Sequence, residues 1–453
     1  MRVAYTGSDR APGPRGLALA RKMWDLRLNA MTATVDSIRA YGDVIETRMP
    51  GARMFTIHRA AHAEHVFVTN QDNYEKGAHH EIYAMALGQG LITANGELWR
   101  RQRRLLQPMF AKRHLDVFTA HMTSACAGML DTWDASYRDG DVIDVAGAMM
   151  DLTLDVVGRA LFGADLTGDV SRTIARAMRE FVTEAHGVIY SPLTWAAYAV
   201  PGVGMDTAMK LRPRRRRRFI GSLDGLDRIV AQMIESHRHG DRQGSPDLLT
   251  LLLEARHEET GEAMSDRQIR DEIVNFIVAG HETTANTLAW MWQLLSLYPE
   301  PRERLFAEVD TLLGSRTPTF ADVERLVYTR ALVHETLRLY PVVWMTARRA
   351  IGEDVIGGVR IPAGASVGVL MYLTHRDPDV WSNPDGFDPT RFLGDGHSGG
   401  PQRCNFIPFT AGRRICLGNT FAIIEATLLA SMIARRYVLD LAEGPKQAEP
   451  TLT

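Results

Sequence analysis

The sequence predicts a mainly α-helical protein that carries small β-sheets. Apolar residues recur at helical spacing in many segments, whereas only a few short segments alternate as strands do. One predicted helix, from Ser265 to Leu297, would be about 50 Å long at about 1.5 Å per residue, which is long enough to cross a whole domain. The content of 45% hydrophobic and 23% charged residues is typical of globular proteins and excludes disordered and fibrous classes.

The bulk numbers favour one large domain over 1–453, because a bulky cofactor can supply the centre of a core of this size. A net charge of −2 gives no overall reason to expect a nucleic-acid partner. Three cysteines are too few for a disulfide framework and fit a reducing compartment. Residues 1–21 form a Pro/Gly-rich segment, expected to be flexible, without the apolar run of a signal peptide or membrane anchor. We therefore expect a soluble, cytoplasmic protein.

The first part of the chain alternates predicted helices with one hairpin. Residues 76–96 contain several glycines, and we expect them to form a loop-rich gate that faces the substrate. The apolar stretch 187–205 is interrupted by prolines and glycines and is interpreted as a mobile lid over an access channel. The predicted elements are helices over 22–41, 60–68, 114–137 and 143–162, and strands over 44–48 and 54–58 on either side of Pro50-Gly51.

A run of arginines from Arg212 to Arg218 is the sharpest local concentration of charge. Pro213 suits the first turn of a helix, and an apolar stripe follows over 220–234. We interpret the arginines as the solvated start of that helix. Because the chain as a whole is not basic, nucleic-acid binding is not expected.

The long helix begins with a predicted capping box, Ser265 with Gln268, and ends before Pro299. Halfway along it lies Ala279-Gly280-His281-Glu282-Thr283-Thr284, which places an acid and two hydroxyls in an apolar helix. A threonine there can bond to a carbonyl one turn earlier, and Gly280 leaves space beside the backbone. A local widening of the helix would make room for O₂ and water. The alternative interpretation is a polar kink that is satisfied internally.

Near the C-terminus, Cys416 lies between Gly412 and Gly418, just ahead of an apolar helical run over 421–433. Both glycines are predicted to allow backbone that a β-carbon would crowd. The dipole of the following helix favours the ionised thiol, and a lone thiolate suits an axial metal ligand. Taken alone, such a residue could equally be a buried structural cysteine.

The pattern Phe409-x-x-Gly412-x-Arg414-x-Cys416-x-Gly418 resembles the haem-binding signature of the cytochrome P-450 superfamily, the haem-thiolate monooxygenases. The resemblance implies a triangular helical prism around a buried haem b, held without covalent attachment because no Cys-x-x-Cys-His occurs. Cys416 would be the iron ligand, Phe409 would pack beside it, and Arg414 would bond a haem propionate. Many soluble bacterial members carry histidine in place of this arginine.

Other motifs follow in the order of the family. Ala279 to Thr284 resembles the oxygen-activation motif, which implies that Thr283 hydrogen-bonds the bound oxygen and Glu282 relays protons; Ala279 and Gly280 would face the haem. Trp99-x-x-x-Arg103 resembles the pair that bonds a propionate. Arg348 matches another arginine that reaches a propionate, although adjacent Arg349 leaves the register open.

Two further segments resemble the parts of a buried charge triad. Glu335-x-x-Arg338 resembles the family's Glu-x-x-Arg, and the segment from Pro384 to Phe392 resembles the one that supplies a second arginine, Arg391. Thr390 stands where many members have glutamate, which leaves the arginine intact. We assign the triad an architectural role. Between these motifs, 342–347 is expected to be extended, and 356–364 with 366–371 to form a hairpin.

The resemblance implies an enzyme that inserts one oxygen atom from O₂ into a lipophilic small molecule. Electrons would come from a separate acidic ferredoxin or flavodoxin with its reductase, docked on Arg413 and the arginines at 100, 101 and 104. We expect a monomer. A peroxide-driven peroxygenase, a haem-thiolate isomerase and a non-catalytic haem-binding gas sensor remain alternatives. The expected pocket walls include Met85, Leu87, Asn275, Ala279, Val343 and Trp344.

Overall fold

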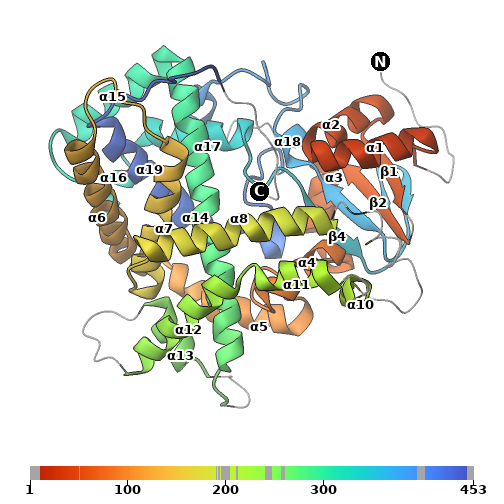
Figure 1. The fold of residues 1–453 in the computed structure, drawn as a ribbon. Coiled ribbons are helices and arrows are strands. Elements are labelled where there is room, and N and C mark those ends of the chain that lie inside the picture. Colours follow the sequence, from red (N-terminus) through yellow and green to blue (C-terminus); the bar gives the residue numbers. More distant parts are fainter. Residues whose placement is uncertain are drawn as a thin grey trace.

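The computed structural model describes residues 11–49, 51–189, 191, 194, 205–210, 213–239, 247–256, 261–394 and 404–445. Most of them are helical, as the sequence predicts. Helix α14 (Asp266–Leu297) runs through the middle of the molecule, and α8 (Asp169–Ile189) crosses it (Figure 1). The strands gather on one side with α1 (Leu17–Leu28) and α2 (Ala30–Tyr41), while helices fill the other side.

The remaining helices are α3 (Ala60–Glu64), α4 (Ala78–Leu87), α5 (Gly96–Leu106), α6 (Lys112–Ser136), α7 (Val145–Phe162), α10 (Met205–Lys210), α11 (Pro213–Gly221), α12 (Asp224–His239), α13 (Leu248–Glu254), α15 (Pro299–Leu313), α16 (Phe320–Val323), α17 (Val327–Leu339), α18 (Met371–Thr374) and α19 (Asn419–Ala434). Among the described residues, no helix is both long enough and apolar enough to cross a lipid bilayer.

The N-terminal part differs from the prediction in two places. The helix expected over 22–41 is two helices, because the Asn29 side chain accepts the backbone N–H of Thr32 at 2.9 Å and starts a new helix. The gate expected over 76–96 contains the ten-residue helix α4, which ends at Gly88 with a φ of 73°. Only residues 76–77 and 88–95 of this expected gate lie outside helices.

Two sheets form the β side of the molecule. The larger sheet has the order β1 (Val44–Met49), β2 (Ala52–Ile57), β7 (Ser366–Val369), β4 (Thr346–Ala350), β3 (Tyr74–Glu75). Strands β5 (Asp354–Ile356) and β6 (Val359–Ile361) form a separate hairpin. The predicted β1–β2 hairpin is confirmed. The hairpin predicted to include 366–371 is wrong, because β7 lies parallel to β2 and antiparallel to β4.

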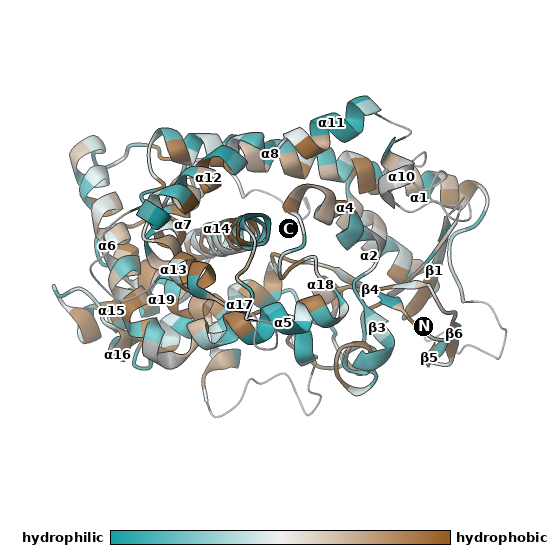
Figure 2. Ribbon diagram, turned by 90° about the horizontal axis from the view of Figure 1, so that it is seen from below, coloured by the Kyte–Doolittle hydropathy of each residue, from teal (hydrophilic) through white to brown (hydrophobic). Residues whose placement is uncertain are grey.

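Helix α14 is confirmed at both ends. The Ser265 and Gln268 side chains form the predicted capping box, and the next helix starts at Pro299. Figure 2 views α14 nearly along its axis, with other helices around it. At Gly280 a β-carbon would lie 2.9 Å from the Val157 side chain of α7, so this glycine allows two helices to approach closely.

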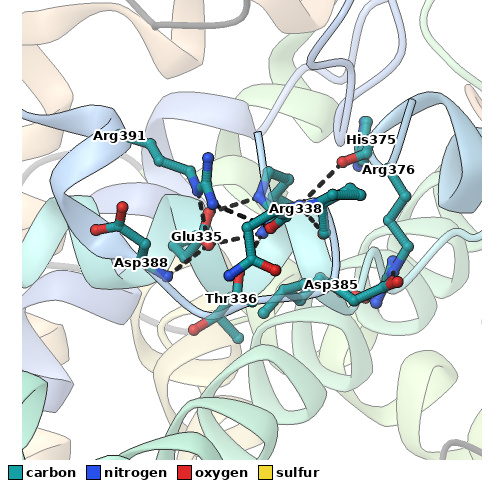
Figure 3. A network of polar contacts seen from close by, with 12 residues as sticks. Glu335, Thr336, Arg338, His375, Arg376, Asp385, Asp388 and Arg391 are labelled. Atoms are coloured by element: carbon teal, nitrogen blue, oxygen red, sulfur yellow. Dashed lines mark hydrogen bonds and ion pairs between the residues drawn. The ribbon is translucent and has the colours of Figure 1, made fainter. Parts of the chain in front are cut away.

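The charge triad is confirmed as a buried network (Figure 3). Glu335 and Arg338 have no exposed side-chain surface and form two contacts of 2.6 and 2.7 Å, and Arg391 lies 3.5 Å from the same carboxylate. The Arg338 guanidinium also donates to backbone carbonyls at 375, 384 and 386. Every charge in this group therefore has a protein partner, which fixes α17 to the segment that leads to Arg391.

The arginine run and the expected lid are only partly described. Arg212 lies outside the described residues, α11 begins at Pro213 as predicted, and the helical pattern breaks before α12 begins at Asp224. Most of the expected lid over 187–205, including its prolines, lies outside the described residues.

Candidate active site

The Cys416 loop is folded tightly against the π-helical turn His65–Thr69. Gly412 has a φ of 70°, and a β-carbon there would lie 1.7 Å from the carbonyl oxygen of Phe67. Only glycine fits this position without displacing the backbone. The Cys416 N–H donates to the carbonyl of Phe409 at 3.0 Å, which closes the loop.

Gly418 does not have the role predicted for it. Its φ is −89°, and a β-carbon there would meet no protein atom within 4 Å. The residue instead lines the cavity described below. The space beside Gly418 is therefore open because the residue has no side chain, and a bound group can occupy that space.

The thiol of Cys416 faces this cavity, and α19 begins three residues later, as predicted. The Gly418 N–H and the Arg103 guanidinium lower the pKa of Cys416, but burial outweighs both and raises it. The start of the following helix therefore favours the ionised form, as expected, but burial has the larger effect in the protein without a metal. Binding a metal would replace the proton.

A cavity of about 470 Å³ lies between α14 and the Cys416 loop. Cys416 and Phe409 line one side, and Glu282 and Thr283 of α14 line another. The structure thus brings together two motifs that are far apart in the sequence. Of the expected walls, Met85 does not line the cavity and packs against the core instead; those that do are Leu87, Asn275, Ala279, Val343 and Trp344.

The acid and alcohol of α14 lie on a regular helix. The Thr283 hydroxyl donates to the carbonyl of Ala279 at 2.7 Å, the bond one turn earlier that the sequence predicts. Residues from Asp266 to Leu297 form one continuous α-helix, and no π-helical turn interrupts it at the expected widening. Ala279 and Gly280 also line the cavity.

Trp99 and Arg103 lie on α5, as their spacing predicts, and both line the cavity. The Arg103 guanidinium donates to the carbonyl of Ile415 at 2.8 Å, beside the cysteine. Arg414 stacks over the Trp99 ring at 4.2 Å and donates to the Ala94 carbonyl and the Asn95 side chain. These contacts position two cations at one edge of the cavity.

Arg348 and Arg349 have different environments. Arg349 forms ion pairs with Glu75 at 2.8 Å and with Glu81 at 2.9 Å. Arg348 is buried and stacks over the Phe67 ring, and within the described part of the chain it donates only to the Ala347 carbonyl and the Thr346 hydroxyl. The arginine that lacks an acidic partner is therefore Arg348.

Three cations lie close enough to affect one another in this region: Arg348 is buried, and Lys76 and Arg414 are half-buried. Burial lowers the pKa of Arg348 to about 10 and that of Arg414 to about 9, and both arginines lower the pKa of Lys76 further. Among the described residues, none of the three forms an ion pair with a carboxylate. Unpaired buried cations are costly, so their arrangement fits a ligand that supplies negative charge, such as the two propionates of haem.

Sequence reasoning missed a set of acceptors on α14 that hold the loop after α4. Three polar side chains accept backbone N–H groups of this loop, at distances of 2.8 to 3.0 Å: Asp271 from Gln89, Glu272 from Leu91 and Asn275 from Ile92. β-Carbons at Gly88 and Gly90 would lie 2.0 and 2.5 Å from the Asp271 and Asn275 side chains. Leu91 and Ile92 line the cavity, so α14 fixes one wall through these bonds.

Glu425 is a second residue that the sequence analysis missed, although an acid inside the apolar run over 421–433 is a visible signal. It is fully buried on α19, and burial raises its pKa to about 8, although the nearby Thr284 hydroxyl lowers it. Neither carboxyl oxygen has another hydrogen bond of standard geometry among the described residues. A neutral acid therefore lies next to the Glu282-Thr283 turn.

Comparisons with known proteins agree with this geometry. The family model of cytochrome P-450 matches residues 12–452. Cyclooctat-9-en-7-ol 5-monooxygenase of Streptomyces melanosporofaciens is 34% identical over 90% of this chain and 85% of its own. Pentalenene oxygenase of Streptomyces avermitilis is 30% identical over 88% and 85%. A crystal structure of the cytochrome P450DA heme domain has a TM-score of 0.76 at 27% identity, covering 89% of this chain and 86% of that one. The chain therefore belongs to the cytochrome P-450 family of monooxygenases.

Proposed function

We propose that the chain binds haem b in the central cavity, with Cys416 as the iron ligand, and inserts one atom of O₂ into a lipophilic small molecule. The observation that carries the proposal is the position of the Cys416 thiol and the Glu282-Thr283 pair on the same cavity. Bound haem with a thiolate ligand supplies the activation of O₂, with two electrons and protons from outside.

The residues around the cavity hold the cofactor and exclude water. Arg348, Arg414 and the Trp99–Arg103 pair would bind the propionates, because these side chains offer N–H donors that form no ion pair with an acid among the residues that the structure describes. Gly418 leaves room for the macrocycle, and Phe409 packs beside the sulfur. The Gly418 N–H points to the sulfur and would temper its donation to a metal.

The acid and alcohol of α14 would move protons into the cavity. The Thr283 hydroxyl donates its proton to the Ala279 carbonyl in this structure, and it would rotate away from that carbonyl to pass the proton into the cavity. Glu282 lies next to it on the cavity wall and can pass protons to it. A sensor or an isomerase has no need of this pair, so its presence favours O₂ activation.

The substrate is expected to be lipophilic because the cavity walls are mainly apolar side chains, including Leu87, Val343 and Trp344. Two relatives, named for cyclooctat-9-en-7-ol and pentalenene, support an organic small molecule.

The enzyme would be a cytoplasmic monomer. It would receive electrons from a ferredoxin or flavodoxin with its reductase. Arg413 pairs with Asp72, and Arg100 and Arg104 share the single carboxylate of Glu97. These exposed arginines thus retain positive charge, and turnover with an acidic partner should decrease as salt increases.

The deciding experiment replaces Cys416 with serine and measures the reduced, carbon-monoxide-treated protein. The long-wavelength Soret band and oxygenase activity should both be lost, because an alcohol is a poor iron ligand. Retention of both would refute the ligand assignment. In the wild-type protein, turnover that needs a reductase and O₂ supports the proposal, whereas turnover with peroxide alone would instead indicate a peroxygenase.

Thr283→Ala tests the proton path. It should keep haem and substrate binding but divert a large share of the reducing equivalents to hydrogen peroxide. Product formation tightly coupled to electron consumption in this variant would contradict the role given to Thr283.

A further inference from the structure

A second, smaller cavity of about 40 Å³ adjoins the central one. It lies under α1 and α2, against strands β1 and β2. His79, Ile189 and Met345 line both cavities, so these side chains lie between the two, at a boundary that we call the neck. A volume of this size holds about three water-sized groups, which is enough for a carboxylate.

One of the residues that line the small cavity is a buried lysine. Lys22 of α1 is only 7% exposed, and its Nζ donates to the hydroxyl of Thr47 at 3.0 Å. Among the described residues, no carboxylate forms an ion pair with it. A lysine this deeply buried normally has an ionic partner.

The nearest acid on the adjoining strand is committed elsewhere. Side chains alternate across a strand, so Glu46 points to the opposite face of β1 from Thr47. There it pairs with Arg53 at 2.6 Å and Arg48 at 3.2 Å. The face toward Lys22 instead carries Thr47 and, on β2, Thr56. It offers hydroxyls and no negative charge.

We propose that this small cavity binds the carboxylate of a lipophilic acid, which Lys22 and Thr47 contact while the hydrocarbon part passes the neck into the central cavity. The proposal rests on the proposed oxygenase function and names its substrate class. The carbon that is oxidised would be remote from the acid, because the two ends of the ligand occupy different cavities.

The local electrostatics agree with this assignment. Burial lowers the pKa of Lys22 to about 8, so most of the amine is still charged at pH 7. Burial lowers the pKa of His79 at the neck to about 4, so the imidazole is neutral and presents no second cation. A carboxylate entering the site would therefore meet one charge, that of Lys22.

The test compares ligands that differ only in the head group: tetradecanoic acid, its methyl ester and 1-tetradecanol. Binding to the haem-loaded protein is measured at pH 7 by calorimetry and by the shift of the Soret band. The wild-type protein should bind the acid at least about tenfold more tightly than the ester or the alcohol, because a hydrogen bond to a charged group is worth this much.

Two variants of Lys22 sharpen the test. Lys22→Met should lose the preference for the acid and keep the affinity for the ester, whereas Lys22→Arg should retain the preference. Arg21→Met is the matched control, because it removes one positive charge from an 86% exposed side chain of the same helix and should change nothing.

Equal binding of acid and ester by the wild-type protein, or an undiminished preference in Lys22→Met, would overturn the proposal. This failure differs from failure of the proposed function. A protein without haem would fail the carbon-monoxide spectrum before any ligand is added, whereas a haem-loaded protein that ignores the head group would contradict only the role of Lys22.

Discussion

Two groups of buried arginines in this molecule are built in opposite ways. Arg338 contacts Glu335 at 2.6 and 2.7 Å and donates to three backbone carbonyls, so the protein satisfies it completely. Arg348 and Arg414 are held by carbonyls, side-chain oxygens and aromatic rings but form no ion pair within the described part of the chain. The Arg338 group lies far from Cys416 in the sequence, and we call it the closed group because its charges already have protein partners. Arg414, in contrast, lines the central cavity.

The difference separates architecture from binding. A buried charge that is paired within the protein can fix two segments in place, but it has nothing left for a ligand. A buried charge without a counter-ion destabilises the empty protein and gains most when a ligand brings the counter-ion. The same criterion identifies Lys22, which is buried in the small cavity without an acid.

The largest expected effect comes from breaking the closed group. Arg338→Met leaves Glu335 buried with only the more distant Arg391 as a counter-ion, which should lower the free energy of unfolding by about 3–5 kcal/mol. Chemical denaturation of the haem-free protein measures it. The double variant Glu335→Met/Arg338→Met is the control and should recover part of the loss. A decrease below about 1 kcal/mol in the single variant would contradict the closed arrangement.

Arg348→Met should act in the opposite direction on the haem-free protein. Removing an uncompensated buried charge should leave the free energy of unfolding of the haem-free protein unchanged or raise it. Haem dissociation should become about tenfold faster or more, because a charged hydrogen bond to the haem is lost. Haem transfer to apomyoglobin measures the dissociation rate. Arg349→Met is the matched control, because Arg349 already pairs with Glu75 and Glu81. An equal effect of both variants would contradict the assignment.

Buried acids extend the comparison. Burial raises the pKa of both Glu335 and Glu425; two arginines lower that of Glu335, whereas no cation of the described residues lowers that of Glu425, which is about 8. In the unfolded chain Glu425 loses its proton near pH 4.5. The contribution of protonated Glu425 to the free energy of unfolding is therefore complete below that pH and is lost as the pH rises toward 8. Glu425→Gln should remove this dependence of the free energy of unfolding on pH, whose slope is at most about 1.4 kcal/mol per pH unit. Unfolding curves at pH 5, 6.5 and 8 measure it, and an unchanged slope would contradict the assignment.

Local signals predicted the parts of the fold that local chemistry decides. The capping box at Ser265 and the proline at 299 set both ends of α14, and Gly412 ahead of Cys416 predicted a tight loop. The break at Asn29 was missed because helical spacing continues through it, while a side-chain cap starts a new helix there. Helix α4 was missed because the glycines at its ends favoured a loop.

Contacts between distant segments decided the rest. Strand β7 looks like a partner for the neighbouring segment, but its hydrogen bonds go to β2, more than 300 positions earlier, and to β4. The side chains that accept hydrogen bonds from the loop after α4 were also not predicted, because Asp271 and Glu272 resemble ordinary charged residues near the start of a helix. For Cys416, the sequence indicated the dipole that lowers its pKa but not the burial that outweighs it.

The smallest expected effect concerns ion pairs at the surface. Glu97 holds Arg100 and Arg104, and all three side chains are more than half exposed. Glu97→Gln should change the free energy of unfolding by less than about 1 kcal/mol, because water already solvates these charges. It should nevertheless speed association with an acidic ferredoxin at low salt, since both arginines lose their counter-ion. Stopped-flow reduction at two ionic strengths measures this, and a rate that ignores both the substitution and the salt would place the docking surface elsewhere.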